Sequence, residues 1–139
     1  MENLHEIYNI FLIAMSITAL IVFIALFFVT AGYGKFTTAK WGAAVNNKIG
    51  WVLMESPVFI AMLLLWFFSR RRFMITPFIM FLLFETHYFH RSFIFPLLLK
   101  GKSKMPVSII SMGVTFNLLN AIMQGGWLFY LSAPDRYPA

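Results

Sequence analysis

Two carboxylates and a phenol lie inside stretches of sequence that are otherwise strongly apolar. Glu55 lies in one of them, and Glu85 and Tyr88 lie in the stretch FETHYFHRSF at 84–93. A charged side chain at mid-bilayer costs about 2.5–3.5 kcal/mol on insertion scales, so such groups normally face a protein interior and mark a pathway or a site. Glu55 is the stronger candidate, because Pro57 tends to kink its helix and open space beside the carboxylate.

Each of these polar groups also has a structural interpretation. For Glu55, that interpretation is an ion pair with Arg91 or a histidine. For Glu85, the structural interpretation is preferred, and it is a hydrogen bond between helices. The sequence predicts no metal site, because His87 and His90, three positions apart on a helix, point in divergent directions. Only His5 remains elsewhere in the chain.

The composition predicts an integral membrane protein. Hydrophobic residues make up 60% of the 139 residues and charged residues 12%, and the mean hydropathy is +0.79. These values are far from those of a soluble domain. The chain has no cysteine, and its net charge of +6 comes from short basic tracts between apolar runs. We therefore expect membrane lipids, and not nucleic acid, to be the charged partner.

Four apolar runs are long enough to cross about 30 Å of hydrocarbon, which takes roughly 20 helical residues. They lie near residues 7–31, 50–69, 73–99 and 107–131. The expected fold is all-α: an integral membrane bundle with four transmembrane helices in this chain. Glu2 and Glu6 precede the first run, where a signal peptide would have basic residues, and the run is too long for a cleaved signal peptide.

The basic residues between the runs predict the orientation. The first and third connections carry six lysines, and the second carries the arginine triplet at 70–72. Basic residues are enriched in cytoplasmic loops, so the first and third connections are expected on the cytoplasmic side. The N-terminus is then on the non-cytoplasmic side of a bacterial inner membrane or an endoplasmic reticulum.

Counting residues from the turns brings distant side chains to one depth. Helices joined by tight turns are antiparallel, so residues equally far from a turn are level. Glu55 lies 16 residues before Arg71, and Tyr88 lies 17 after it. Around the next turn, Tyr88 lies 14 residues before Lys102, and Phe116 lies 14 after it. We expect the carboxylate, the phenol and the aromatic ring to meet in one layer.

The last apolar run contains a polar stripe. Phe116, Asn120 and Gln124 recur at i, i+4 and i+8, so they share one helix face that is a candidate lining of the same cavity. The alternative is that the two amides only hold neighbouring helices together.

Four segments resemble the membrane steroid 5-alpha-reductase family in order and spacing, and together they cover most of the chain. They are AGYGKF at 31–36, WVLMESP at 51–57, HYFHRSFIFPLL at 87–98 and TFNLLNAIMQG at 115–125. The resemblance implies a bundle of seven transmembrane helices that reduces the 4,5 double bond of 3-oxo-Δ4-steroids with NADPH.

The resemblance also implies roles for individual residues. In the family, residues matching Glu55 and Tyr88 hold the steroid 3-keto oxygen, and aromatic residues matching Tyr33, Trp51 and Phe116 line the steroid cavity. Hydride delivery to an enone pushes negative charge onto the ketone oxygen, where a buried hydroxyl donor contributes most. A neighbouring carboxyl group orients the tyrosine and, when protonated, donates a hydrogen bond itself.

This chain departs from the family in two places. Met112 stands where one member of the family has an arginine, which puts one polar contact near the cavity in doubt. The chain ends at LSAPDRYPA, where the family continues with three helices that carry most NADPH contacts, and it has no G-x-G-x-x-G or P-loop. We therefore expect an N-terminal part of a longer reductase, inactive alone, whose cofactor-binding residues lie beyond Ala139.

Two alternatives remain open at this stage. Related membrane reductases act on polyprenols or enoyl-CoA, so an isoprenoid-like lipid is an alternative substrate. The competing function is a non-catalytic four-helix membrane protein that binds a lipid or a partner subunit.

Overall fold

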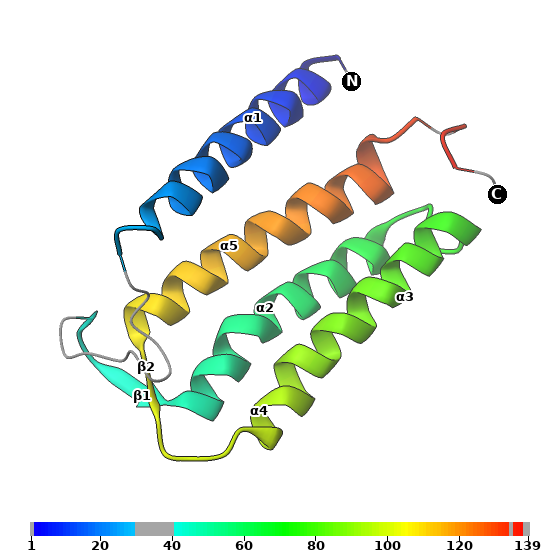
Figure 1. Cartoon of the computed structure of the whole chain (residues 1–139). Helices are drawn as coiled ribbons and strands as arrows, with labels where there is room; N and C mark the ends of the chain where they lie inside the picture. Colours follow the sequence, from blue (N-terminus) through cyan, green and yellow to red (C-terminus); the bar gives the residue numbers. More distant parts are fainter. Residues whose placement is uncertain (1, 30–40, 134, 138–139) are drawn as a thin grey trace. The chain divides into compact units, whose positions relative to one another are not determined.

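The computed structural model describes residues 2–29, 41–133 and 135–137, which fall in two compact units, Met1–Ala31 and Gly32–Ala139 (Figure 1). The described elements follow in the order α1 (Glu2–Ala25), β1 (Ala44–Asn46), α2 (Asn47–Phe68), α3 (Ile75–Phe89), a π-helical turn (His90–Ile94), α4 (Phe95–Leu98), β2 (Lys104–Pro106), α5 (Val107–Gly126) and a second π-helical turn (Trp127–Leu131).

Two hydroxyl groups in helix α1 form hydrogen bonds within the helix. The hydroxyls of Ser16 and Thr18 donate to the carbonyl oxygens of Leu12 and Ala14, one turn earlier, each at 2.8 Å. A hydroxyl that bonds within its own helix needs no outside partner. These two polar side chains are therefore compatible with a lipid environment, where an unsatisfied group is costly.

Three described helices are long and apolar enough to cross a membrane: Asn3–Ala25, Asn47–Phe68 and Val107–Leu131. The third expected span, residues 73–99, is helical over residues 75–98, but a π-helical turn divides it into α3 and α4. The expected all-α membrane bundle is confirmed, and the two strands of three residues are a departure from it.

A short antiparallel ribbon joins the starts of α2 and α5. In the register of β1 and β2, Ala44 lies opposite Pro106. The Val107 amide extends the pairing by donating to the Ala43 carbonyl oxygen at 2.8 Å. Each strand leads directly into a helix. Although the strands are antiparallel, α2 and α5 both run away from the ribbon in the same direction, and α3 returns in the opposite direction (Figure 1).

Glycines let α5 approach α2 closely. A Cβ atom at Gly125 would lie 2.7 Å from a methyl carbon of Leu65 and 3.0 Å from the sulfur of Met62, and one at Gly113 would collide with Met54. Small residues are the usual points of close contact between helices in lipid. The α2–α5 pair therefore forms the tight centre of the second unit.

An aromatic core closes the unit near the α2–α3 turn. Trp66 stacks on Phe81 with 4.6 Å between the ring centroids, and Phe81 meets Phe129 edge to face at 6.5 Å. The Arg71 guanidinium donates to both the carbonyl oxygen and the hydroxyl of Ser132. These contacts tie the turn to the end of the helical segment that follows α5.

The close approach at Gly125 yields a prediction. Gly125→Leu should destabilise the protein by about 1–3 kcal/mol, the usual cost of overpacking a filled contact. Thermal unfolding in detergent, followed by circular dichroism, measures this as a lower midpoint. Gly126→Leu is the matched control, because a Cβ atom there would have no neighbour within 4 Å. Equal midpoints for the two variants would contradict the close packing at Gly125.

Candidate functional site

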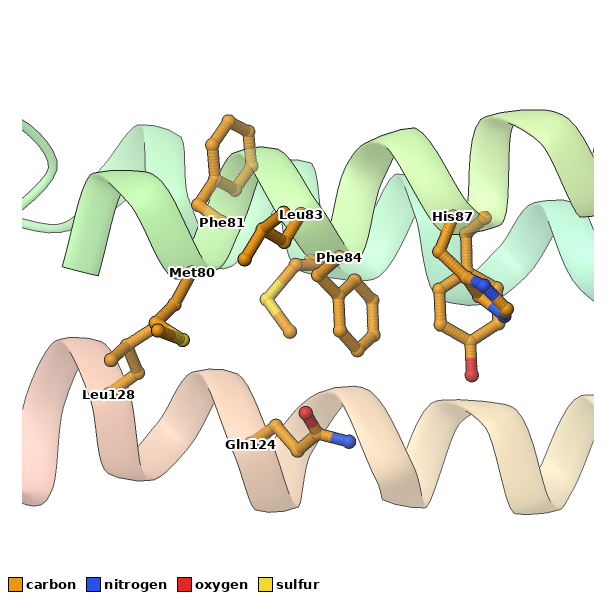
Figure 2. A pocket seen from close by; sticks show the side chains of 9 residues that line it. Met80, Phe81, Leu83, Phe84, His87, Gln124 and Leu128 are labelled. Carbon is orange, nitrogen blue, oxygen red and sulfur yellow. The ribbon is translucent and has the colours of Figure 1, made fainter. Parts of the chain in front are cut away.

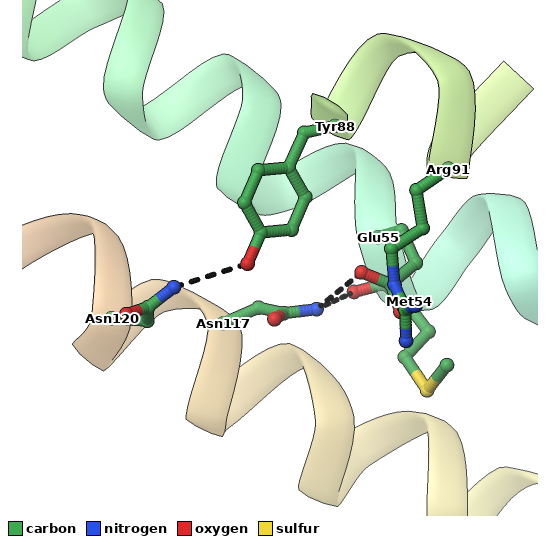
Figure 3. Close-up of polar contacts among 6 residues, drawn as sticks. All are labelled: Met54, Glu55, Tyr88, Arg91, Asn117 and Asn120. Atoms are coloured by element: carbon green, nitrogen blue, oxygen red, sulfur yellow. Dashed lines mark hydrogen bonds and ion pairs between the residues drawn. The ribbon is translucent and has the colours of Figure 1, made fainter. Parts of the chain in front are cut away.

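Glu55 lies at the centre of a polar layer that three helices build. Its side chain projects from α2 and is buried, with 2% of the residue exposed. Arg91 Nε lies 2.8 Å from one carboxylate oxygen, and Asn117 Nδ2 of α5 donates to the other at 3.1 Å (Figure 3). Both oxygens are therefore engaged, and the carboxylate is a hydrogen-bond acceptor on each side.

Local backbone irregularity helps to place this layer. Pro57 lies inside α2 and cannot donate to the carbonyl oxygen one turn earlier. The neighbouring carbonyl oxygen of Met54 accepts a second bond from Asn117 Nδ2, at 2.9 Å. Arg91 lies in the π-helical turn after α3, and such wider turns often occur at functional sites.

The Arg91 guanidinium also has an aromatic partner. Its central carbon lies 5.1 Å from the ring centroid of Trp51, which is one turn before Glu55 on α2. Trp51 in turn meets Phe95 edge to face at 5.0 Å. Cation–π contact and the ion pair therefore fix the Arg91 guanidinium from two sides.

Tyr88 forms the second half of the layer. Asn120 Nδ2 of α5 donates to the Tyr88 hydroxyl oxygen at 3.0 Å, and Gln124 Nε2 donates to Asn120 Oδ1 at 2.8 Å. The Tyr88 ring packs against Phe84, with 4.5 Å between centroids, and meets His87 edge to face at 5.0 Å. The phenol is thus held by α3 on one side and α5 on the other (Figure 3).

A cavity of about 390 Å³ lies beside Tyr88, lined by residues of α2, α3, α5 and the second π-helical turn. Its polar lining residues are His87, Tyr88 and Gln124; the others are Met62, Met80, Phe81, Leu83, Phe84 and Leu128 (Figure 2). The cavity therefore suits an apolar ligand with a hydrogen-bonding group at one end.

The structure brings together most of the predicted site residues that it describes. Glu55, Tyr88, Asn120 and Gln124 lie in the polar layer or at the cavity, and Trp51 stacks on Arg91. Phe116 does not join them, because 58% of it is exposed. Tyr33, with the whole AGYGKF segment, lies outside the described residues.

The remaining ionisable residues of the 84–93 stretch have different surroundings. Glu85 is buried, with 8% exposed, and neither carboxyl oxygen has a hydrogen-bond partner among the described residues, so the expected interhelical bond is not formed there. His87 and His90 are exposed. Within the described ranges, no group of three or more His, Cys, Asp or Glu side chains is arranged to hold a metal ion.

The sequence prediction missed Asn117, the residue that bonds Glu55. A signal for it exists, because Asn117, Asn120 and Gln124 occur at i, i+3 and i+7, which is also the spacing of one helix face. The ion pair of Glu55 with Arg91 was one of the structural interpretations of the sequence, and it is formed.

Comparison with known proteins gives relatives of one kind. No protein-family model matches the chain. The chain is 38% identical over 107 residues to steroid 5-alpha-reductase DET2 of Arabidopsis thaliana, covering 73% of this chain and 41% of that relative. It is 32% identical over 138 residues to steroid 5-alpha-reductase DET2 of Gossypium hirsutum, covering 92% and 51%. It is 34% identical over 120 residues to 3-oxo-5-alpha-steroid 4-dehydrogenase 2 of Sus scrofa, covering 84% and 46%.

Helices of membrane-spanning length beside a buried polar layer and a largely apolar cavity define a class, the helical membrane proteins. Within that class, the chain is a homologue of the steroid 5-alpha-reductases, which confirms the resemblance found in its sequence. It spans about half the length of the curated relatives it matches.

The buried ion pair yields a prediction on stability. Arg91→Gln leaves the Glu55 carboxylate without its cation, so the protein should lose stability. The loss should stay below the roughly 3–5 kcal/mol of a fully buried pair, because 43% of the Arg91 side chain is exposed. The double variant Glu55→Gln/Arg91→Gln removes the uncompensated charge and should be more stable than Arg91→Gln. Thermal midpoints in detergent measure both, and a double variant no better than the single one would refute the pairing.

Proposed function

We propose that this chain supplies the substrate-side half of an NADPH-dependent membrane reductase that acts on the 4,5 double bond of 3-oxo-Δ4-steroids or a similar lipid enone. The observation that carries the proposal is the position of the Tyr88 hydroxyl, at the polar end of an apolar cavity and in one layer with Glu55. The names of the relatives support the substrate class.

The cavity matches the proposed substrate in size and polarity. Its volume of about 390 Å³ falls within the range of roughly 300–1,000 Å³ that small-molecule sites occupy. A steroid is a rigid apolar body with a carbonyl group at one end. Its ring system would contact the methionine, leucine and phenylalanine side chains, and its ketone would face Tyr88.

The chemistry of enone reduction explains why a tyrosine is suitable there. When a hydride adds to carbon 5, the electron pair of the double bond moves toward carbon 3, and negative charge develops on the ketone oxygen. A proton added at carbon 4 then completes the saturated ketone. A fixed donor aimed at the developing oxyanion stabilises this step by about 2.7–4 kcal/mol. In our proposal, the Tyr88 hydroxyl is that donor.

Glu55 has a more restricted role in this arrangement. Because its oxygens accept bonds from Arg91 and Asn117, direct donation from Glu55 to the ketone would require one of these bonds to be exchanged when substrate binds. Tyr88 donates without such an exchange. We therefore propose that Glu55 holds the ketone end together with Tyr88, chiefly by fixing the polar layer.

Three of the described arginines are already engaged within the chain, which makes them poor candidates for the phosphate groups of NADPH. Arg71 and Arg72 donate to main-chain carbonyl oxygens, and Arg91 is paired with Glu55. We propose that the cofactor contacts come from a second half, corresponding to the part of the relatives that lies outside the matched segment. A complete native reading frame that continues with further apolar spans would support this half-site. A stop codon after Ala139, with stable accumulation of the short protein, would favour the non-catalytic alternative.

The assignment of Tyr88 and Glu55 predicts the loss of activity in two variants. In the protein read from the complete native frame, Tyr88→Phe should lower the rate of steroid reduction about 10²–10³-fold, the usual effect of removing one oxyanion donor. Glu55→Gln should also lower it, because the amide weakens the bond to Arg91. NADPH oxidation with a 3-oxo-Δ4-steroid measures both rates.

Tyr130→Phe is the matched control for this experiment, because that hydroxyl donates to the Leu65 carbonyl oxygen, away from the polar layer. Unchanged turnover in both Tyr88→Phe and Glu55→Gln would remove the basis of the proposal. A panel of a 3-oxo-Δ4-steroid, a polyprenol and an enoyl-CoA identifies the substrate class.

A further inference from the structure

A directed chain of hydrogen bonds ends on the Tyr88 hydroxyl. Gln124 Nε2 donates to Asn120 Oδ1 at 2.8 Å, and Asn120 Nδ2 donates to the Tyr88 oxygen at 3.0 Å. An amide nitrogen donates and does not accept, so the phenol oxygen is the acceptor in this bond. The single hydrogen of the phenol is therefore not used on Asn120.

The direction of this chain determines what Tyr88 offers to a ligand. The described residues form no hydrogen bond in which the Tyr88 hydroxyl is the donor. Tyr88 and Gln124 both line the cavity, so the unused hydrogen belongs to a group at its surface. If the Asn120 amide were turned around, its carbonyl oxygen would take that hydrogen, and the cavity would lose its phenol donor.

Asn120 and Asn117 have different tasks on the same helix. Asn117 donates to the Glu55 carboxylate and to the Met54 carbonyl oxygen, both on α2. Asn120, one turn later, donates to Tyr88 on α3 (Figure 3). The contact of Asn120 with Tyr88 is thus separate from the contacts that hold Glu55, and each can be altered alone.

We propose that Asn120 is a positioning residue that keeps the Tyr88 hydroxyl a hydrogen-bond donor toward a ketone oxygen in the cavity. Gln124 holds the Asn120 amide in the orientation that this requires. This inference rests on the proposed function, and it changes the role expected for both amides from lining the cavity to orienting the donor. A hydroxyl that accepts one hydrogen bond also becomes a stronger donor in the next, so the chain strengthens the contact as well as directing it.

A positioning role for Asn120 predicts that Asn120→Asp is more damaging than Asn120→Ala, the reverse of the order expected from side-chain shape. Asn120→Asp has nearly the shape of asparagine, but its ionised carboxylate only accepts, so it takes the Tyr88 hydrogen away from the ligand. Asn120→Ala removes the partner and leaves that hydrogen free. If Asn120 were only structural, aspartate would be the milder change. If it orients the donor, aspartate is the more damaging one.

The experiment uses the protein read from the complete native frame, in lipid nanodiscs, with a 3-oxo-Δ4-steroid labelled with ¹³C at carbon 3. Infrared spectroscopy measures the labelled carbonyl stretch, which moves to lower wavenumber when the oxygen accepts a hydrogen bond. We expect the full shift in the wild type, a smaller shift in Asn120→Ala, and its loss in Tyr88→Phe and, at neutral pH, in Asn120→Asp. As the pH is lowered and the carboxylate introduced by Asn120→Asp protonates, the shift should return, because a protonated carboxyl group donates to Tyr88 again.

The outcomes separate this inference from the proposed function. A carbonyl shift that Tyr88→Phe abolishes but Asn120→Asp preserves at neutral pH overturns the positioning role alone. An Asn120→Ala spectrum as unshifted as that of Tyr88→Phe overturns it as well. Absence of steroid binding, or of the shift, in the wild type overturns the proposed function and this inference with it.

A second variant covers the case in which Asn120→Asp does not fold. Gln124 is exposed, so Gln124→Met should leave the thermal midpoint unchanged, yet it frees the Asn120 amide to turn. We expect a partial loss of the carbonyl shift, while the thermal midpoint shows that the variant is folded. A full wild-type shift in Gln124→Met would contradict the role given to Gln124 and, with a misfolded Asn120→Asp, the inference as a whole.

Discussion

The burial of one carboxylate governs the arrangement of the second unit. Glu55 on α2 is removed from solvent, and it is tolerated there because Arg91 and Asn117 reach it from two other helical segments. Moving Arg91 away would leave a buried charge without compensation, which is among the most costly changes a protein interior can undergo. Moving α5 away would leave one carboxylate oxygen without its hydrogen bond from Asn117. The ion pair of Glu55 with Arg91 thus fixes how α2 and the segment after α3 are aligned along and around their axes.

The positions of the other residues in the candidate site follow from the way Glu55 and Arg91 align their helical segments. Once Arg91 is held against Glu55, Tyr88 one turn earlier on α3 faces α5, where Asn120 meets it. Close packing of α5 on α2 depends on glycines at the contact, since larger side chains would separate the helices. The cavity beside Tyr88 is therefore a product of the same contacts that neutralise Glu55.

The sequence predicts the depth of a residue along the helix bundle better than it predicts which side of its helix faces the neighbouring helices. Counting from the turns placed Glu55 and Tyr88 at one level, and both are in the polar layer. The same counting placed Phe116 there, but its helix turns it outward and presents Asn117 instead. Rotation about a helix axis depends on side-chain packing against neighbours, which no count of residues contains. The π-helical turn at His90–Ile94 is equally hidden, because it arises from the hydrogen bonds of the folded backbone.

The ribbon between β1 and β2 has a consequence for the order of folding. It pairs residues that lie about sixty positions apart, and α2, α3 and α4 occupy the interval. Closing so long a loop is entropically unfavourable while the intervening chain is disordered. We therefore expect the α2–α3 hairpin, whose contacts are closer in sequence, to form before the strands meet. In that order, the ribbon forms late and joins the starts of two helices that are already in the bilayer. A chain in which the ribbon cannot form would still insert into the membrane. The start of α5 would then not be held beside the start of α2 while the helices pack.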